Sequence, residues 1–331
     1  MRIVIATGIY PPEVGGPALY AKGVKESLEK AGHDAPVILF GTLKKYPSGL
    51  RHLLYAFKLW RAARGADAIF AFDTYSAGVP AAFIGMISRV PVVIRIGGDF
   101  VWESYIERTH DLVPLPEFYR APRALSRKEK IAKKLVGWML RHGELAFNAA
   151  WLAGIWREPY GIDGSRVHVV ENVIGERIAH SNQSDRSVLM FGRQMALKNN
   201  SAFRAAFEKA QVDGINLELK EGIVPHAELM ELMRSCYAVA LPSISDVAPN
   251  GIIDAIRFGV PFIMTKNSSY AEKYKDMGII IDPLDEVDMF RGIKSLADPI
   301  TYERLRTNIA AYAEVRTYDD VARDMLSILK K

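Results

Sequence analysis

Two aspartates, Asp246 and Asp254, stand with seven residues between them in the second half of the chain. An apolar run at 238–241 predicts a buried strand before Asp246. A helix is expected to begin at Asn250–Gly251 and to end at Gly259, because small polar residues favour helix entry and glycine favours helix exit. Ligands of open α/β sheets bind at the carboxyl ends of strands, and the free N–H groups of a helix start suit a diphosphate.

Alternating strands and helices must position these residues. A strand at 3–7, a glycine turn, a helix ended by Gly32 and a strand at 35–40 form a βαβ unit, which implies a parallel sheet. Residues 104–126 are expected to be irregular, and amphipathic helices are expected at 80–88 and 128–142. The other expected strands are 68–71, 91–96, 145–148, 167–170, 187–191, 216–220, 238–241, 262–264 and 278–281.

The stretch around the two aspartates resembles the retaining glycosyltransferases of the GT-B fold, of the glycosyltransferase family 4 (group 1) type. Members often read Pro-Ser, Glu-x-x-Pro-Asn, Glu-Ala and Gly-x-Pro in this order. The matching residues here are Pro242-Ser243, Pro249-Asn250, Ala255 and Gly259 to Pro261. Both acids of the family's Glu-x7-Glu pair are Asp in this chain, one methylene shorter. The alternative is a strand, loop and helix with two solvated acids.

Three further elements follow the family's order. Pro-Pro-x-x-Gly-Gly, with Gly15 and Gly16, follows the first strand, where a tight turn is the alternative. Gly192-Arg193 and Lys198-Asn199 follow the strand at 187–191, where solvated loop cations are the alternative. The strand at 91–96 lacks the His found in many relatives. Asp99 follows it, and a helix cap is the alternative role for this residue.

The resemblance implies an α/β protein of two Rossmann-like domains that face each other across a cleft. The acceptor-side domain would cover 1–175, with a C-terminal helix at about 316–331 crossing back to it, and the nucleotide-sugar domain would cover 176–315. The polar run 180–186 is the expected boundary. The implied activity is metal-independent, retaining transfer from a nucleotide sugar to a glycan or lipid-linked sugar acceptor in cell-surface polysaccharide synthesis.

The resemblance also implies roles for single residues. Asp246 would hold hydroxyls of the donor sugar, Asp254 would hold the ribose, and Asp99 would contact donor or acceptor hydroxyls. Arg193 and Lys198 would neutralise charge that grows on the diphosphate as the sugar–phosphate bond breaks. The remaining donor contacts would come from Gly15, Gly16, Gly222, Val224, Asn250 and Gly251. No cofactor or metal is expected, because there is no Asp-x-Asp and no His/Cys cluster with ligand spacing.

Two other functions remain open. One is a catalytically silent GT-B protein that acts as a nucleotide-sugar sensor or as the partner of an active subunit. The double Asp and the missing His motivate this alternative, and slow hydrolysis of a nucleotide sugar would argue against it. The other is a Rossmann oxidoreductase, which the absence of a Gly-x-Gly-x-x-Gly turn disfavours. Neither the nucleotide base, the sugar, the acceptor nor the oligomeric state follows from the sequence.

The chain has 331 residues, enough for about two domains, and a hydrophobic content of 49% typical of globular proteins. Cys236 is the single cysteine, so no intramolecular disulfide is possible, and a reducing compartment is favoured. The N-terminal run 2–9 is too short for a signal peptide, and two prolines follow it closely. No apolar stretch reaches the ~20 residues of a membrane-spanning helix. We therefore expect a cytoplasmic protein.

Positive charge is concentrated in the first half of the chain. Residues 120–141 contain eight Lys or Arg and one Glu, and residues 44–64 contain six Lys or Arg and no acid. Solvated helix faces are one interpretation. The other is a surface for anionic lipid at the inner membrane face, with Trp60 and Trp138 at the headgroups. Nucleic acid is a weaker candidate, because no known binding motif accompanies the charge.

Overall fold

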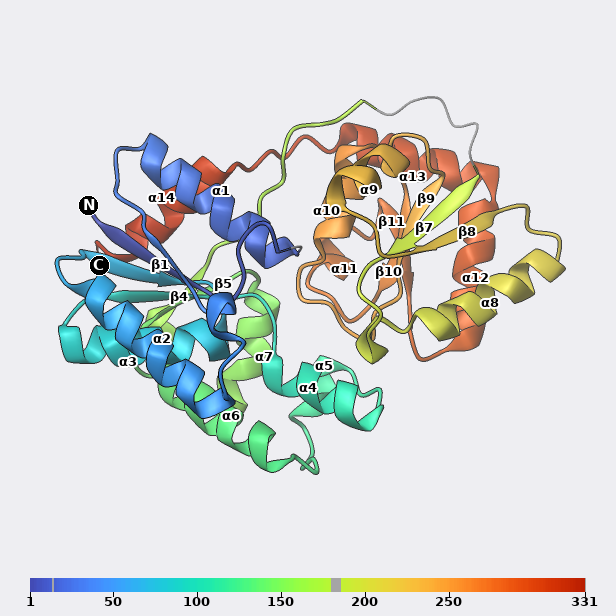
Figure 1. Ribbon diagram of the computed structural model, residues 1–331. Coiled ribbons are helices and arrows are strands. Elements are labelled where there is room, and N and C mark those ends of the chain that lie inside the picture. Colours follow the sequence, from blue (N-terminus) through green and yellow to red (C-terminus); the bar gives the residue numbers. More distant parts are fainter. Residues whose placement is uncertain (14, 180–185, 331) are drawn as a thin grey trace. The chain divides into compact units, whose positions relative to one another are not determined.

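The computed structural model describes residues 1–13, 15–179 and 186–330 (Figure 1). They form two compact units. Unit 1 contains residues 1–104, 123–173 and 316–331, and unit 2 contains residues 105–122 and 174–315. Most of the expected boundary run, residues 180–185, lies outside the described residues. Each unit is an α/β structure with its own parallel sheet, so the predicted pair of Rossmann-like units is confirmed.

Unit 1 is built on a six-stranded sheet with the order β2-β1-β3-β4-β5-β6, and every pair of neighbouring strands is parallel. The central strands are continuous apolar runs because helices cover both faces of a parallel sheet. The strands are β1 (Ile3–Thr7), β2 (Val37–Leu39), β3 (Ala68–Ala71), β4 (Val92–Ile96), β5 (Glu144–Phe147) and β6 (Val167–Val169).

The helices around this sheet include the last one in the chain, α14 (Tyr318–Ile328), which packs on α1 (Gly16–Lys30). Gly23 permits this contact, because a Cβ built on it would lie 2.5 Å from the Tyr318 ring. Lys30 and Asp319 add an ion pair with an N–O distance of 2.7 Å. The other helices with residues in unit 1 are α2 (Ser48–Ala63), α3 (Val79–Ser88), α4 (Phe100–Thr109), α6 (Arg127–Met139) and α7 (Ala150–Tyr160).

Unit 2 is built on a five-stranded parallel sheet with the order β11-β10-β9-β7-β8. Its strands are β7 (Ser187–Phe191), β8 (Glu218–Gly222), β9 (Ala238–Leu241), β10 (Phe262–Thr265) and β11 (Gly278–Ile281). Two apolar clusters pack against the sheet. The helices are α8 (Asn200–Val212), α9 (His226–Met233), α10 (Asn250–Arg257), α11 (Tyr270–Lys273), α12 (Glu286–Ala297) and α13 (Pro299–Ala311).

The irregular structure predicted for residues 104–126 is wrong over much of this segment. Helix α4 continues to Thr109, and a short helix, α5 (Leu115–Phe118), follows it. Val101, Tyr105 and Ile106 have the helical spacing of a buried face, which the nearby prolines obscured. Residues 105–122 group with unit 2, where the Leu115 N–H donates to Ser245 Oγ at 2.9 Å.

Candidate functional site

The candidate site of unit 2 lies where its parallel strands end. All five strands point the same way, so the loops that follow β7, β9 and β10 share one edge of the sheet. The loop after β7 carries Lys198, and the loop after β9 carries Asp246. The two loops are joined directly, because the Ile244 N–H donates to the Leu197 carbonyl at 2.8 Å. The sheet therefore places a cation and an acid, 48 residues apart in sequence, side by side.

Lys198 and Asp246 form an ion pair with an Nζ–Oδ2 distance of 2.8 Å. Both side chains are mostly buried, with 23% and 21% of their surface exposed. The backbone on either side of the pair is fixed. Asn199 adopts a left-handed conformation with φ of 55°, and its Nδ2 donates to the Pro283 carbonyl at 2.6 Å. The Asp246 N–H donates to the Asn267 carbonyl at 3.1 Å.

The helix α10 begins directly after this loop, with Asn250 as its first residue and Pro249 before it. Pro249, as the N-cap residue, provides no side-chain cap. The first-turn N–H groups of an α-helix lack partners within the helix, and they favour a bound anion. Gly251 lies close to β9, since a Cβ there would be 3.2 Å from Leu241 Cδ1. The local structure therefore fits a diphosphate near Asn250 and Gly251.

Asp254, one turn into α10, has two cationic neighbours in the structure. Its Oδ1 accepts a hydrogen bond from Arg257 Nη1 at 3.2 Å, and its Oδ2 lies 3.7 Å from His226 Nε2. The nearby Asp254 carboxylate raises the pKa of His226 above the ordinary value of 6.5, while burial opposes this effect. Arg257 also donates from Nε to the Glu176 carbonyl at 3.1 Å. The carboxylate of Asp254 is therefore oriented before any ligand arrives.

The other predicted residues of unit 2 occupy the same edge. Gly192 directly follows β7 and Gly222 is the last residue of β8, with φ of 156° and 147°, values that L side chains rarely adopt. The Gly192 N–H donates to the Gly222 carbonyl at 2.9 Å. Arg193 is exposed, and Val224 is half-buried before α9. Lys198, Asp246, Asn250, Gly251 and Asp254 lie on the loops or helix that follow β7 and β9, Gly222 is the last residue of β8, and Val224 lies in the loop after it.

Three predicted residues belong to unit 1. Gly15 precedes α1 with φ of 152°, and Gly16 is the first residue of that helix. Asp99 is 1% exposed, and both of its oxygens are used inside the unit. They accept hydrogen bonds from the Trp102 N–H at 2.9 Å and from Trp156 Nε1 at 2.7 Å. These contacts agree with the helix-capping alternative for Asp99.

Sequence reasoning missed the two partners of Asp254. His226 is the first residue of α9, and Pro225 before it provides no side-chain cap. The contact of His226 with Asp254 joins two different helices, so no local pattern indicates it. Arg257 could have been found, since its position three residues after Asp254 places both side chains on one helix face.

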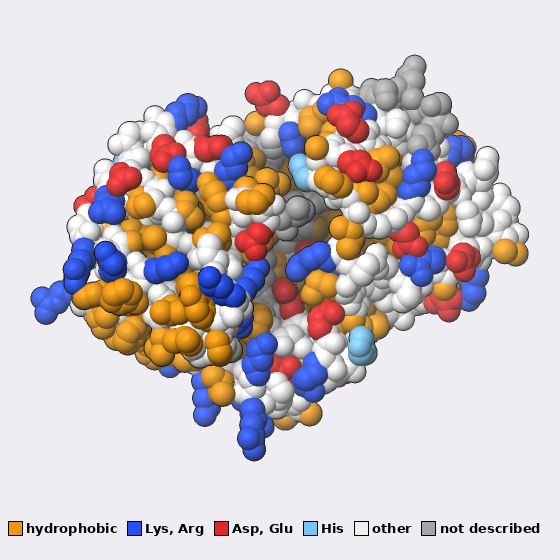
Figure 2. Space-filling view, viewed as in Figure 1, with side chains coloured by type: hydrophobic (Ala, Val, Ile, Leu, Met, Phe, Trp, Pro, Cys, Tyr) orange, Lys and Arg blue, Asp and Glu red, His pale blue; other side chains and the backbone are white. Residues whose placement is uncertain are grey.

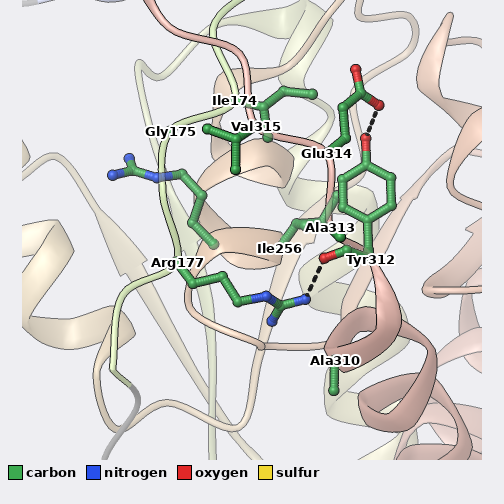
Figure 3. A pocket seen from close by; sticks show the side chains of 10 residues that line it. Ile174, Gly175, Arg177, Ile256, Ala310, Tyr312, Ala313, Glu314 and Val315 are labelled. Atoms are coloured by element: carbon green, nitrogen blue, oxygen red, sulfur yellow. Dashed lines mark hydrogen bonds between the residues drawn. The ribbon is translucent and has the colours of Figure 1, made fainter.

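Arg257 also lines a cavity of about 250 Å³ on unit 2 (Figure 3). Arg177 points into the same region, and its Nη2 donates to the Tyr312 carbonyl at 2.8 Å, while the Tyr312 hydroxyl donates to Glu314. The lining residues are Ile174, Gly175, Arg177, Ile256, Arg257, Ala310, Tyr312, Ala313, Glu314 and Val315. Through Arg257, one wall of this cavity is hydrogen-bonded to Asp254.

No protein-family model matches the sequence, and no curated protein matches it. Solved structures do match over nearly the whole chain. A sucrose-phosphate synthase from Thermosynechococcus elongatus is similar with a TM-score of 0.71 at 13% identity, covering 99% of this chain and 98% of that one. HepE of Anabaena, in complex with UDP, is similar with a TM-score of 0.62 at 16% identity, covering 100% and 98% of the two chains.

A third similar structure is WaaG, a glycosyltransferase involved in lipopolysaccharide biosynthesis. Its TM-score is 0.68 at 12% identity, and the match covers 97% of this chain and 98% of that one. The chain has the GT-B fold. This finding confirms the fold that the motifs predicted, and at these identities it concerns the fold alone.

Proposed function

We propose that the protein is a retaining glycosyltransferase that moves a sugar from a nucleotide-sugar donor to a glycan or a lipid-linked sugar acceptor. The observation that carries this proposal is the Lys198–Asp246 pair, held at 2.8 Å in the loops that precede α10. A cation, an acid and the start of a helix are what a sugar diphosphate requires at one place. HepE, which shares the fold, was solved in complex with UDP.

In the proposed complex, Lys198, Arg193 and the first N–H groups of α10 bind the diphosphate. Donor binding transfers Lys198 from the Asp246 carboxylate to the phosphate oxygens, and it frees Asp246 to accept hydrogen bonds from donor-sugar hydroxyls. Positive charge then lies where negative charge grows as the sugar–phosphate bond breaks. The acceptor hydroxyl gives its proton to the departing phosphate oxygen, and its oxygen forms the new bond to the anomeric carbon on the face the phosphate leaves.

Asp254 would accept hydrogen bonds from the ribose hydroxyls. Its two basic neighbours, Arg257 and His226, hold the carboxylate in a fixed orientation. Gly222 and Val224 would contact the base through backbone groups, and the glycine at position 222 lets the chain approach closely. Gly15 and Gly16 of unit 1 would approach the donor phosphates and the acceptor.

Donor binding and slow donor hydrolysis test this function together. A thermal-shift panel of nucleotides and nucleotide sugars should identify the donor, because a ligand at 100 times its dissociation constant adds about 2.7 kcal/mol of stability. The identified nucleotide sugar should then be hydrolysed slowly without acceptor, and product analysis by NMR should give the retained anomer. Absence of any shift across the panel would contradict the proposed function.

The second candidate is a catalytically silent protein that binds a nucleotide sugar as a sensor or as the partner of an active subunit. The Lys198–Asp246 pair favours this candidate, because Lys198 could not stabilise the departing diphosphate if the pair stayed closed in the presence of the donor. Donor binding without hydrolysis, also in the presence of lipid-linked acceptors, would support this candidate. Hydrolysis that Lys198→Ala removes would exclude it.

The proposed acceptor side is unit 1, and the proposed place of action is the cytoplasm at the inner membrane face, in cell-surface polysaccharide synthesis. The support is the charge of unit 1, which holds both basic stretches apart from residues 120–122. Among the helices of the described residues, none combines the length and apolar character needed to cross a bilayer. A lipid-linked acceptor would therefore be reached from the membrane surface.

A further inference from the structure

An exposed apolar face covers part of unit 1. It is formed by α2, α3 and α6, with α3 in contact with both of the other helices. Figure 2 shows hydrophobic side chains gathered over α2 and α3, with Lys and Arg side chains along their edge. The large apolar side chains that these two helices expose are Leu50, Leu53, Phe57, Phe83, Met86 and Ile87. Ile131 and Leu135 of α6 are also exposed.

The apolar face continues from α3 to α6. The rings of Phe83 and Trp138 have centroids 6.4 Å apart. Helix α3 contains no charged residue, although Phe83, Met86 and Ile87 face outward. A surface helix of a globular domain normally carries charged and polar residues on its outer face. Large exposed apolar patches mark interaction surfaces, so this face requires a partner.

The charges around this face restrict the partner to an anionic one. Helices α2 and α6 together contain eight Lys or Arg, and their only acid is Glu129. Glu129 is buried and forms a capping box with Ser126, so it offers no negative charge to the surface. A second copy of the chain would bring the same positive charges to a symmetric contact, which disfavours a dimer through this face.

A cationic hollow lies beside the apolar stripe of α6. Its volume is about 510 Å³, and no acid is among the residues that line it. Lys130, Lys133, Lys134 and Arg141 supply its positive charge, and Tyr160 supplies an aromatic side chain. Lys130 and Lys134 are four residues apart in α6, as are Ile131 and Leu135, so a cationic row and an apolar row lie next to each other on the helix. Such a hollow suits a phosphate group attached to an apolar body.

We propose that this face of unit 1 docks onto a bilayer that contains anionic lipid. The exposed apolar side chains of α2, α3 and α6 enter the boundary between headgroups and acyl chains, and the surrounding cations contact lipid phosphates. The hollow beside α6 holds one headgroup phosphate. Docking requires no nucleotide sugar, so it can be tested independently of the proposed catalysis.

Vesicle flotation with the full chain tests the proposal. The protein is mixed with vesicles of phosphatidylcholine alone or of phosphatidylcholine and phosphatidylglycerol, at low and at high salt. We expect binding to the anionic vesicles only, and weaker binding at high salt because screening acts over ~10 Å at 0.1 M. Lys130→Glu with Lys134→Glu should abolish binding.

A variant that changes no charged residue distinguishes insertion of apolar side chains from simple charge attraction. Leu53 and Ile87 are 71% and 50% exposed, so Leu53→Ser with Ile87→Ser leaves the folded core intact. We expect anionic-vesicle binding about tenfold weaker or more, since two apolar side chains no longer enter the boundary. The matched control is Val212→Ser with Ile300→Ser, at positions 91% and 82% exposed in unit 2, which should bind like the unchanged protein.

Several results would overturn docking. They are equal binding to both vesicle types, no binding to either, or a Leu53→Ser/Ile87→Ser protein that binds as well as the control. A dimer in light scattering that this variant dissociates would assign the face to a second copy instead. Unchanged circular dichroism excludes misfolding as the cause of lost binding. Donor hydrolysis, measured on the same proteins without vesicles, should be equal and reports separately on the proposed function.

Discussion

Lys198 donates a hydrogen bond to Asp246 across 2.8 Å, from the loop after β7 to the loop after β9. Each side chain neutralises the other in a setting where about four-fifths of each is shielded from water. Opening the pair without a replacement partner would leave a partly buried charge, which is costly. A diphosphate is such a replacement for the acid, because it offers Lys198 more negative charge than Asp246 does. We therefore expect donor binding to separate Lys198 from Asp246.

Replacing Lys198 by Ala should lower turnover by roughly 10² or more, as for loss of an oxyanion donor worth ~2.7–4 kcal/mol. Turnover is measured as donor consumption, and the fold is checked by thermal unfolding. The matched control is Lys294→Ala, which removes an ion pair with Asp213 of the same 2.8 Å length on α12. Equal activity of the two variants would remove Lys198 from the diphosphate site.

The two aspartates should give different kinetic effects when each is replaced by Ala. Asp254→Ala should mainly weaken nucleotide binding, because ribose contacts are equal in the ground state and the transition state. Asp246→Ala should mainly lower turnover, because its contacts lie next to the reacting sugar. Titration calorimetry with the nucleotide and steady-state kinetics with the donor separate these effects. Identical profiles for the two variants would contradict the division of roles.

His226 should make unfolding depend on pH. Its pKa is raised in the folded protein by Asp254, so its contribution is fully present below its ordinary pKa of 6.5 and is lost as pH rises through the raised value. Because His226 is half exposed, the contribution should stay below about 1 kcal/mol. Comparing thermal unfolding of the unchanged protein and His226→Gln from pH 5.5 to 8.5 should show a difference that disappears at the alkaline end. A difference that grows with pH would contradict this sign.

Gly23→Ala should weaken the packing of α14 on α1. The added Cβ would lie 2.5 Å from the Tyr318 ring, and overpacking of this kind costs about 1–3 kcal/mol. Gly154→Ala is the control, since it lies in helix α7 with nothing within 4 Å of the added Cβ. That control should stabilise the protein by about 0.5–1 kcal/mol, because alanine favours helix more than glycine does. Chemical denaturation measures both changes.

Much of the fold could be predicted because apolar runs define parallel strands. β1, β3, β7, β9 and β11 have the predicted bounds, and β8 begins two residues later than predicted. Patterns fail where tertiary contacts decide the structure, as in the segment after Asp99. There, prolines at 114 and 116 suggested a loop, yet Leu115 is buried and lies within a short helix that contacts Ser245.

The candidate site was predictable in its residue types and only partly in its contacts. Motif spacing placed Lys198, Asp246 and Asp254 after the correct strands. It could not indicate that Lys198 pairs with Asp246, or that His226 approaches Asp254, because these contacts depend on how separate loops and helices are arranged in three dimensions. The sequence indicated a surface for anionic lipid on the two basic stretches, but it could not indicate that α3 joins them with exposed Phe83, Met86 and Ile87.

The packing of α14 on α1 has a consequence for folding during synthesis. Residues 316–331 complete unit 1, yet the ribosome reaches them only after all of unit 2 has been translated. Until then the surface of α1 around Gly23 lacks its Tyr318 partner, while unit 2 can already fold. A nascent chain should therefore expose apolar surface on its first half until residues 316–331 have been synthesised. A premature stop before Tyr318 would leave that surface open to chaperones and proteases.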